Sequence, residues 1–133
     1  MSLTDEERSI VVEQEKMKAL NTFAEVDILR QAGLWNNINN RLYYSAFHAV
    51  CALLISNHRK VGSHQGAVVM LNQYYVLTGL LSKDEGRFYS QLQTQRELSD
   101  YNCTYYATEE DTVPRIAKTK QFIDKVLSLI NQR

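Results

Sequence analysis

The sequence predicts an all-α fold, a five-helix up-and-down bundle with a four-helix core, from three observations. Apolar residues recur at spacings of three and four along most of the chain. Glycine is scarce, with 5 residues in 133, and proline occurs once, which favours long helices joined by short turns. Valine, isoleucine and threonine do not form alternating runs, so no segment is typical of a strand. We expect one helical domain over residues 1–133.

The first two helices have clear boundaries in the sequence. Thr4 and Glu7 have the spacing of a capping box, and Gly33 suits a left-handed C-cap, so the first helix has about seven turns. The second helix follows at once and extends over residues 34–57. The apolar spacing of the first helix is kept by Ile10, Met17, Leu20, Ala24, Ile28 and Leu29.

Three more caps place the remaining helices. Ser63 begins the third helix, which ends near Gly79, and Ser82 begins the fourth with a second capping box. Thr108 begins the fifth, where Pro114 is tolerated in the first turn. Their apolar rows are Ala67, Met70, Leu71, Tyr74 and Leu77 on the third, Phe88, Leu92, Leu98 and Tyr101 on the fourth, and Ile116, Phe122, Ile123, Val126, Leu127, Leu129 and Ile130 on the fifth.

The composition argues against several functional classes. Fifteen basic residues balance fifteen acidic ones, so no overall field favours nucleic acid or membrane. Cys51 and Cys103 make no disulfide framework, and we expect both to be reduced, buried thiols rather than a metal-binding pair. The three histidines show no metal-ligand spacing, and no apolar run reaches the about 20 residues of a membrane span. We therefore expect a cytoplasmic protein with no metal ion, no cofactor and no membrane segment.

The second helix carries two rows of side chains. The first is apolar and mostly small, so a neighbouring helix can approach closely. The second stacks a guanidinium, a phenol, an imidazole and a thiol one turn above another, which a core helix does not need. The first row is Ile38, Leu42, Ser45, Ala46, Ala49, Ala52 and Leu53, and the second is Asn37, Arg41, Tyr44, His48, Cys51 and Ile55.

The fourth helix has a charged residue in its inward row. Arg96 follows Leu92 by one turn, where a leucine is expected. Because burying an unpaired guanidinium is costly, Arg96 must have partners or face a cleft or an interface. Asp100 lies four residues further on, which suits an ion pair along the helix.

Two interpretations of these polar residues stay open. In the first, Arg96 and Asp100 only hold the bundle together, with Tyr44 or His48 as further partners. In the second, Arg41, His48, Arg96 and Tyr101 converge on a phosphate-bearing ligand or RNA. His64 follows the cap of the third helix and is interpreted as a cap-region residue rather than a ligand.

Four segments together resemble the HEPN domain family. Residues 39–54 (NNRLYYSAFHAVCALL) resemble the family's signature helix, with its N-R-x-Y-Y-x-x-F-H-A run. Residues 96–102 (RELSDYN) resemble its R-x-x-A-D-Y segment, and residues 63–66 (SHQG) its short Ser/Thr-His-x-Gly element. Residues 120–130 (KQFIDKVLSLI) resemble its closing helix. The resemblance extends from about Glu15 to Ile130 with order and spacing kept.

This resemblance implies an all-α bundle that dimerises. Many HEPN proteins are metal-independent RNases, often toxins of toxin–antitoxin systems with a nucleotidyltransferase partner. Their active site is an R-x(4–6)-H motif from each protomer, in which arginine stabilises the transition state and histidine does acid–base work. Arg96 matches this motif, but the following positions hold Tyr101, Asn102 and Cys103 in place of histidine. Tyrosine, with a reference pKa of about 10, is a poor general base near neutral pH.

Three hypotheses follow. The leading one is a homodimeric HEPN binding or regulatory protein of a nucleotidyltransferase-associated or toxin–antitoxin-like system, with weak or no nuclease activity. The second is a metal-independent RNase toxin in which Arg96 acts with His48 or Tyr101 as the candidate catalytic residues. The third is a purely structural dimerisation module. Under the leading hypothesis, a nucleotide, an RNA phosphate or the partner is bound by Arg41, Tyr44, His48, Arg96, Asp100 and Tyr101.

Overall fold

The computed structural model describes residues 2–130, and its helices follow the five predicted segments. No strand occurs within residues 2–130, and the all-α class is confirmed. The first predicted helix is divided at Glu25, and the third ends in a π-helical turn, η1. The elements in chain order are α1 (Asp5–Ala24), α2 (Val26–Gln31), α3 (Trp35–Ser56), α4 (His64–Leu71), η1 (Asn72–Val76), α5 (Lys83–Tyr101) and α6 (Glu109–Ser128).

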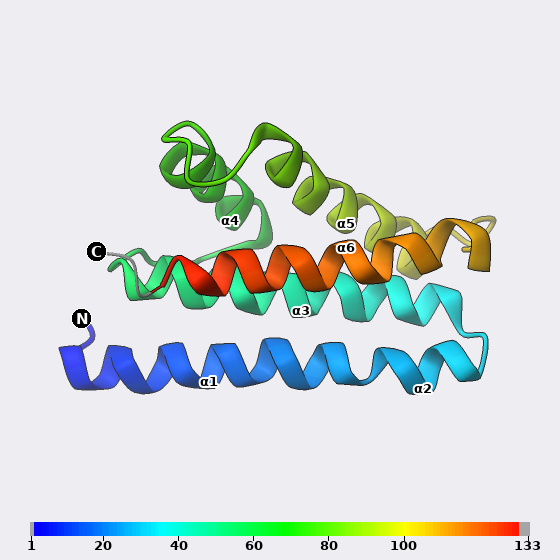
Figure 1. Cartoon of the computed structure of the whole chain (residues 1–133), viewed down its shortest axis with the longest axis horizontal. Helices are drawn as coiled ribbons and strands as arrows, with labels where there is room; N and C mark the ends of the chain where they lie inside the picture. The colour runs from blue at the N-terminus through cyan, green and yellow to red at the C-terminus, as the bar shows by residue number, and fades with distance from the viewer. Residues whose placement is uncertain (1, 131–133) are drawn as a thin grey trace.

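The central element is α3, against which all the other α-helices pack. α1 and α2 run along one side of it, α6 lies beside it, and α4 and α5 cover the remaining side (Figure 1). Both ends of the described chain lie at the same end of the bundle (Figure 1). The small apolar row predicted for this helix is confirmed, because all seven of its members are fully buried: Ile38, Leu42, Ser45, Ala46, Ala49, Ala52 and Leu53.

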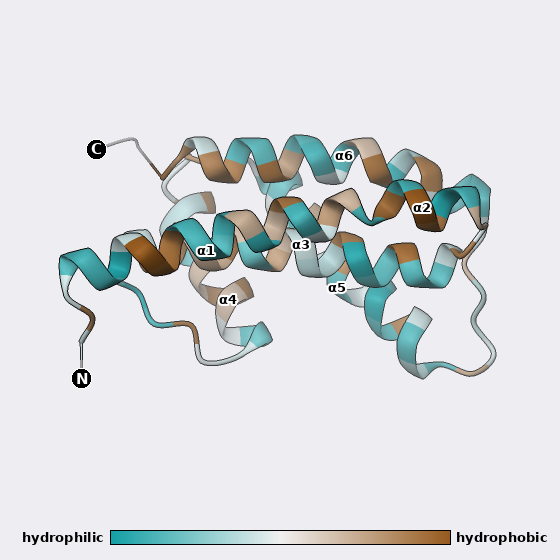
Figure 2. Ribbon diagram, turned by 90° about the horizontal axis from the view of Figure 1, so that it is seen from below, coloured by the Kyte–Doolittle hydropathy of each residue, from teal (hydrophilic) through white to brown (hydrophobic). Residues whose placement is uncertain are grey.

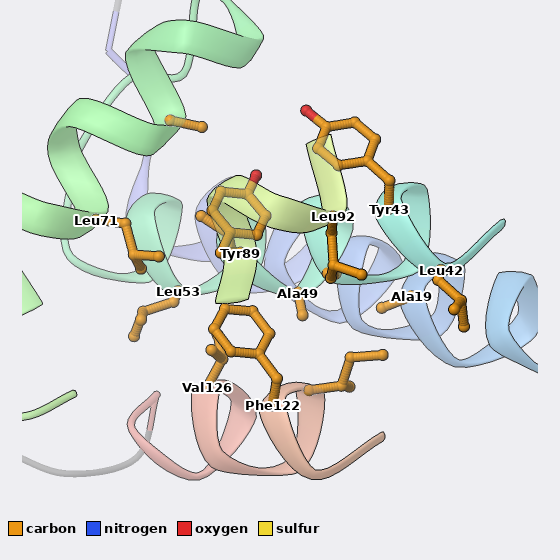
Figure 3. Close-up of a cluster of buried hydrophobic side chains, with 14 of the residues drawn as sticks. Ala19, Leu42, Tyr43, Ala49, Leu53, Leu71, Tyr89, Leu92, Phe122 and Val126 are labelled. Carbon is orange, nitrogen blue, oxygen red and sulfur yellow. The ribbon is translucent and has the colours of Figure 1, made fainter. Parts of the chain in front are cut away.

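An aromatic stack joins three helices at the centre of the core. Tyr43 of α3 stacks on Tyr89 of α5, with ring centroids 6.1 Å apart, and Tyr89 stacks on Phe122 of α6 at 5.6 Å. Figure 3 shows the hydroxyl groups of Tyr43 and Tyr89 directed away from α6, and both side chains are fully buried.

The predicted helix ends are confirmed. Thr4 and Glu7 form the capping box of α1, and Ser82 and Glu85 form that of α5. Gly33 has a φ of +69°, which ends the first segment in the left-handed conformation that glycine adopts at little cost.

Most of the apolar row predicted for the first helix does not face the core, although Leu29 packs against it. Ile10, Met17, Leu20 and Ile28 are 53%, 60%, 43% and 71% exposed. α1 and α2 bury a narrower face made of small and medium side chains, because the small row of α3 lets these helices approach closely. Figure 2 shows hydrophobic and hydrophilic residues interspersed along α1 and α2. The residues that are buried on this segment are Val12, Ala19, Thr22 and Val26.

Candidate functional site

Arg96 is a charged residue inside the bundle, with 6% of its surface exposed. Its guanidinium carbon lies 5.1 Å from the ring centroid of Tyr43, 5.5 Å from that of Tyr44 and 5.6 Å from that of Tyr101. A cation over an aromatic face gains about 0.5–2 kcal/mol, the larger figure where water is excluded. The leucine-like position of Arg96 on α5 therefore directs its side chain against rings of α3 rather than into water.

The polar contacts of Arg96 are few and long. Nη1 donates to the Tyr101 hydroxyl at 3.3 Å and lies 3.8 Å from a carboxylate oxygen of Asp100. Nε is buried and has no hydrogen-bond partner among residues 2–130. A guanidinium has five N–H donors, and a buried charged group normally uses most of them. Arg96 is therefore held in place by rings while much of its hydrogen-bonding capacity stays unused.

A chain of polar groups connects Arg96 with Arg41. The amide nitrogen of Asn40 donates to Asp100 at 3.0 Å, and the amide oxygen of Asn40 accepts from Arg41 Nε at 2.9 Å and from Nη2 at 2.6 Å. The Arg41 guanidinium carbon also lies 5.7 Å from the Tyr44 ring centroid. Five of the six residues predicted to form the ligand pocket therefore lie in one group: Arg41, Tyr44, Arg96, Asp100 and Tyr101.

The sixth predicted residue, His48, turns to another partner. Its Nδ1 lies 3.2 Å from a carboxylate oxygen of Glu15 on α1. Its ring contacts Phe47 edge-on, with centroids 5.6 Å apart. His48 thus lies on the side of α3 that faces α1, and the interactions that hold its imidazole do not include Arg96.

His64, interpreted from the sequence as a cap-region residue, instead joins the aromatic group. It is the first residue of α4, and its Nδ1 lies 2.8 Å from the Tyr43 hydroxyl. Its ring centroid is 4.5 Å from that of Phe47, 5.6 Å from that of Tyr43 and 5.8 Å from that of Tyr44. The sequence signal for this residue is the SHQG element of the family resemblance, although His64 itself is predicted only to be a cap-region residue.

Burial and neighbouring charge shift the proton equilibria of this pair. Desolvation lowers the pKa of His64, and the positive charge of Arg96 lowers it further. Desolvation raises the pKa of Tyr43 to about 12, with Arg96 acting in the opposite sense. At neutral pH, Tyr43 is therefore a protonated phenol and His64 is mostly a neutral imidazole.

Two asparagines of α3 fix the helices that carry the site. Asn39 donates to the Ser99 hydroxyl at 3.0 Å and accepts from Arg115 of α6 at 2.7 Å. Asn36 accepts from the backbone N–H of Ala107 at 2.7 Å. Asn36 and Asn39, in the sequence NNINN at residues 36–40, therefore attach α5, α6 and their connecting loop to α3.

A shallow hollow of about 450 Å³ lies beside the end of α5. Tyr101 lines it and also accepts the hydrogen bond from Arg96, so this ring lies between the hollow and the guanidinium. Tyr101 is 75% exposed, and its side chain can move at low cost. The remaining lining residues are Thr94, Glu97, Leu98, Asn102 and Cys103.

Within residues 2–130, no three histidine, cysteine or acidic side chains come together as metal ligands could. Over the same residues, none of the helices has the length and apolar character needed to span a bilayer.

Comparison with known proteins gives three relatives. The Thermotoga maritima protein named "UPF0332 protein" is 27% identical over 124 residues, 93% of this chain and 94% of the relative. The Methanocaldococcus jannaschii protein named "Putative toxin MJ0605" is 27% identical over 124 residues, 90% of this chain and 92% of the relative. A second protein of that organism, named "Putative toxin MJ0142", is 26% identical over 86 residues, 65% of this chain and 58% of the relative.

A family model places the chain more firmly than these pairwise identities. The model described as the HEPN domain matches residues 12–129, which include most of α1, all of α2 to α5, and α6. The match covers far more than half of the chain, and it includes the signature helix and the Arg96 segment on which the resemblance was based. The chain therefore belongs to the HEPN domain family.

Proposed function

We propose that this HEPN protein is a toxin–antitoxin-like component that binds a phosphate group of a nucleotide or of RNA at Arg96. The binding site is the Arg96 cluster, defined as Arg96, Tyr43, Tyr44, Asp100 and Tyr101. The observation that carries the proposal is a buried guanidinium held by aromatic rings, with an Nε atom that bonds to nothing in the described chain. Relatives named as toxins support the toxin–antitoxin setting.

Arg96 can release its present contacts with Asp100 and Tyr101 when it binds a phosphate group, because neither residue depends on Arg96. Asp100 already accepts a hydrogen bond from Asn40, so its carboxylate keeps a partner when Arg96 turns to an anion. The Tyr101 hydroxyl is at 3.3 Å from Arg96 and belongs to a mostly exposed side chain. A phosphate oxygen that replaces this hydroxyl gains a charge-assisted hydrogen bond from Nη1, and guanidinium groups bind phosphate with two parallel bonds. The exposed Tyr101 ring then offers a surface on which a base can stack.

Binding of a fluorescent single-stranded oligoribonucleotide, followed by anisotropy, tests this proposal. We expect Arg96→Gln to weaken binding by about tenfold or more, because a charged hydrogen bond to phosphate is worth about 1.5–3 kcal/mol. The matched control is Arg87→Gln, since Arg87 is on the same helix but exposed and paired with Asp84. We expect this control to change affinity less than about twofold. Equal losses for both variants, or no loss for Arg96→Gln, would contradict a site at Arg96.

The RNase hypothesis remains a second candidate because the Tyr101 hydroxyl contacts the Arg96 guanidinium directly. A phenol beside a phosphate-binding arginine can exchange a proton with a reacting oxygen when its own pKa is suitable. Cleavage of a labelled RNA in the presence of a chelator, by the wild type and by Tyr101→Phe, tests this candidate. Cleavage by the wild type and loss in the variant support an enzyme, and no cleavage by either supports a binding protein.

We also propose that the chain forms a homodimer and binds a nucleotidyltransferase partner. The exposed apolar residues Ile10, Met17, Leu20 and Ile28 of α1 and α2 offer a surface for a second copy. Light scattering on the wild type and on Met17→Glu tests this assignment, with a shift from dimer to monomer expected for the variant. An unchanged dimer would place the interface elsewhere. Co-expression with a nucleotidyltransferase encoded next to the gene tests the second partner.

A further inference from the structure

The imidazole of His64 contacts the same two tyrosine rings that contact Arg96. Tyr43 and Tyr44 each contact both the Arg96 guanidinium and the His64 imidazole. The two groups come from different helices, α5 and α4, and 32 positions separate them in the numbering of the chain. An anion that reaches Arg96 over these rings therefore meets an imidazole at the same place.

The hydrogen bond between His64 and Tyr43 determines which ring nitrogen of the neutral imidazole carries the proton. The Tyr43 hydroxyl lies 2.8 Å from Nδ1 of His64, and we assign the protonated phenol as the donor and Nδ1 of the neutral imidazole as the acceptor. We assign the ring proton to Nε2, which lies across the ring from Nδ1 and so points away from the buried phenol. Half-buried His64 thus already offers an N–H donor to a ligand in its neutral form.

Tyr43 can also accept a hydrogen bond from the same histidine. If Nδ1 gains a proton, its N–H donates to the phenol oxygen, and the Tyr43 hydroxyl must turn to another acceptor. Tyr89 stacks on Tyr43, and its own buried hydroxyl makes no hydrogen bond within the described residues. Both hydroxyls are directed away from α6 (Figure 3). The pair Tyr43 and Tyr89 therefore accommodates both protonation states of His64.

The charges that face His64 come from the helices packed against α4. α5 contributes Arg96 and Glu97, which act in opposite senses, and α3 contributes His48 in addition to Tyr43. The titratable residues of η1 are engaged elsewhere, Tyr74 with Arg59 and Tyr75 with Asn57. Arg96 is thus the nearest strong positive charge on His64, and an anion that neutralises Arg96 removes this repulsion.

We propose that His64 is the second phosphate-binding group of the Arg96 cluster and takes up a proton from solvent when a phosphate monoester binds there. The inference rests on the proposed function, since it requires an anion at Arg96. In the free protein, His64 is neutral and donates only through Nε2–H. In the complex, both ring nitrogens carry protons, Nδ1–H donates to Tyr43, and the imidazolium forms an ion pair with the phosphate.

This arrangement favours the terminal phosphate of a nucleotide or RNA end over an internal phosphodiester. A phosphate monoester has a second pKa of about 6 and is mostly a dianion at neutral pH, whereas a diester carries one negative charge. A dianion matches two cationic groups, Arg96 and protonated His64. The single charge of a diester is neutralised by Arg96 alone, so a bound diester raises the proton affinity of His64 less than a bound monoester does.

The test follows the imidazole signals of the wild-type protein by NMR from about pH 5 to pH 9. The chain has three histidines, so single His→Gln variants assign every signal. The probes are adenosine 5′-monophosphate, a monoester, and adenylyl-adenosine, a dinucleoside whose only phosphate is a diester. We expect saturation with the monoester to raise the pKa of His64 by about one unit or more, which corresponds to about tenfold tighter binding by the protonated form.

His58, in the turn before α4, is the matched control and keeps its pKa with either probe. A clearly smaller shift of His64 with the diester supports the monoester preference, and an equal shift overturns it. If the monoester binds in an Arg96-dependent way but the pKa of His64 does not rise, the inference about His64 is wrong while the proposed function stands. If neither probe binds and Arg96→Gln leaves RNA binding unchanged, the proposed function itself is wrong.

Discussion

Replacement of Arg96 by methionine is expected to stabilise the protein while it abolishes phosphate binding. The change removes a charged side chain that is only 6% exposed. The unbranched apolar side chain of methionine also reaches the rings of Tyr43 and Tyr44, which the guanidinium contacts in the wild type. Neither former partner is stranded, because Asp100 keeps its bond from Asn40 and the Tyr101 side chain is largely exposed. The substitution therefore separates a ligand-binding arginine from one that holds the bundle together.

The magnitude follows from the contacts of the guanidinium. Desolvation of a buried ion costs several kcal/mol, and the buried Nε without a partner in the described chain adds about 1–3 kcal/mol. On the favourable side are cation–π contacts to three rings at about 0.5–2 kcal/mol each, one hydrogen bond at 3.3 Å and an ion pair at 3.8 Å. Methionine restores part of this gain through sulfur–aromatic contacts of about 0.3–1.5 kcal/mol. We expect the free energy of unfolding to rise by about 1–3 kcal/mol.

Urea unfolding followed by circular dichroism measures this free energy, and thermal unfolding should show a Tm higher by about 4–10 °C for a chain of this size. Leu92→Met, one turn earlier on α5 and fully buried, is the matched control, with an expected loss of less than about 1.5 kcal/mol. A loss of about 2 kcal/mol or more in Arg96→Met, beyond that of the control, would show that Arg96 is a structural residue. The phosphate-binding proposal would then lose the observation that carries it.

Three further predictions concern other parts of the molecule. Gly86→Ala should destabilise by about 1–3 kcal/mol in urea unfolding, because a Cβ there would lie 2.9 Å from both Asn72 Oδ1 and Val76 Cγ2; an unchanged or higher stability would mean that η1 yields freely. In phosphate-free buffer, the folded state keeps His64 neutral to a lower pH than the unfolded state does, because folding lowers the His64 pKa. The free energy of unfolding therefore falls as the pH drops below about 6.5, where the unfolded state takes up the proton. His64→Gln lacks this group and should lose less stability than the wild type between about pH 7 and pH 5. A thiol reagent at about pH 8 should modify exposed Cys103 in the native protein and reach Cys51 only after unfolding, because burial raises the Cys51 pKa; modification of two thiols in the native state would contradict the buried placement.

Local signals in the sequence determined the helix boundaries. Thr4, Ser63, Ser82 and Thr108 cap their helices by accepting hydrogen bonds from backbone N–H groups three residues further on, and these bonds depend on neighbouring positions only. Gly33 ends the first segment for the same reason, since a positive φ is a property of one residue. The buried row of α3 was also predictable, because a row of small residues at helical spacing suits only a closely packed face.

The sequence also indicated part of the candidate site. Arg96 stands in a leucine row, and its burial follows from that register once the helix forms. Asp100 and Tyr101 lie four and five residues further on, so their contacts with Arg96 are again local. The partner helix was indicated by the polar row of α3, from which Tyr44 reaches the guanidinium.

Only the tertiary structure decided which distant side chains meet. His64 and Tyr43 are 21 residues apart, and His48 and Glu15 are 33 apart, so each pairing depends on how whole helices cross. The outward direction of Ile10, Met17 and Ile28 likewise depends on which face of α1 and α2 the small row of α3 accepts. Helical spacing shows which residues share a face, but it does not show which helix packs against that face. The packing of α4 on α3 therefore decides that His64 contacts Tyr43 and Tyr44, the rings that also contact Arg96.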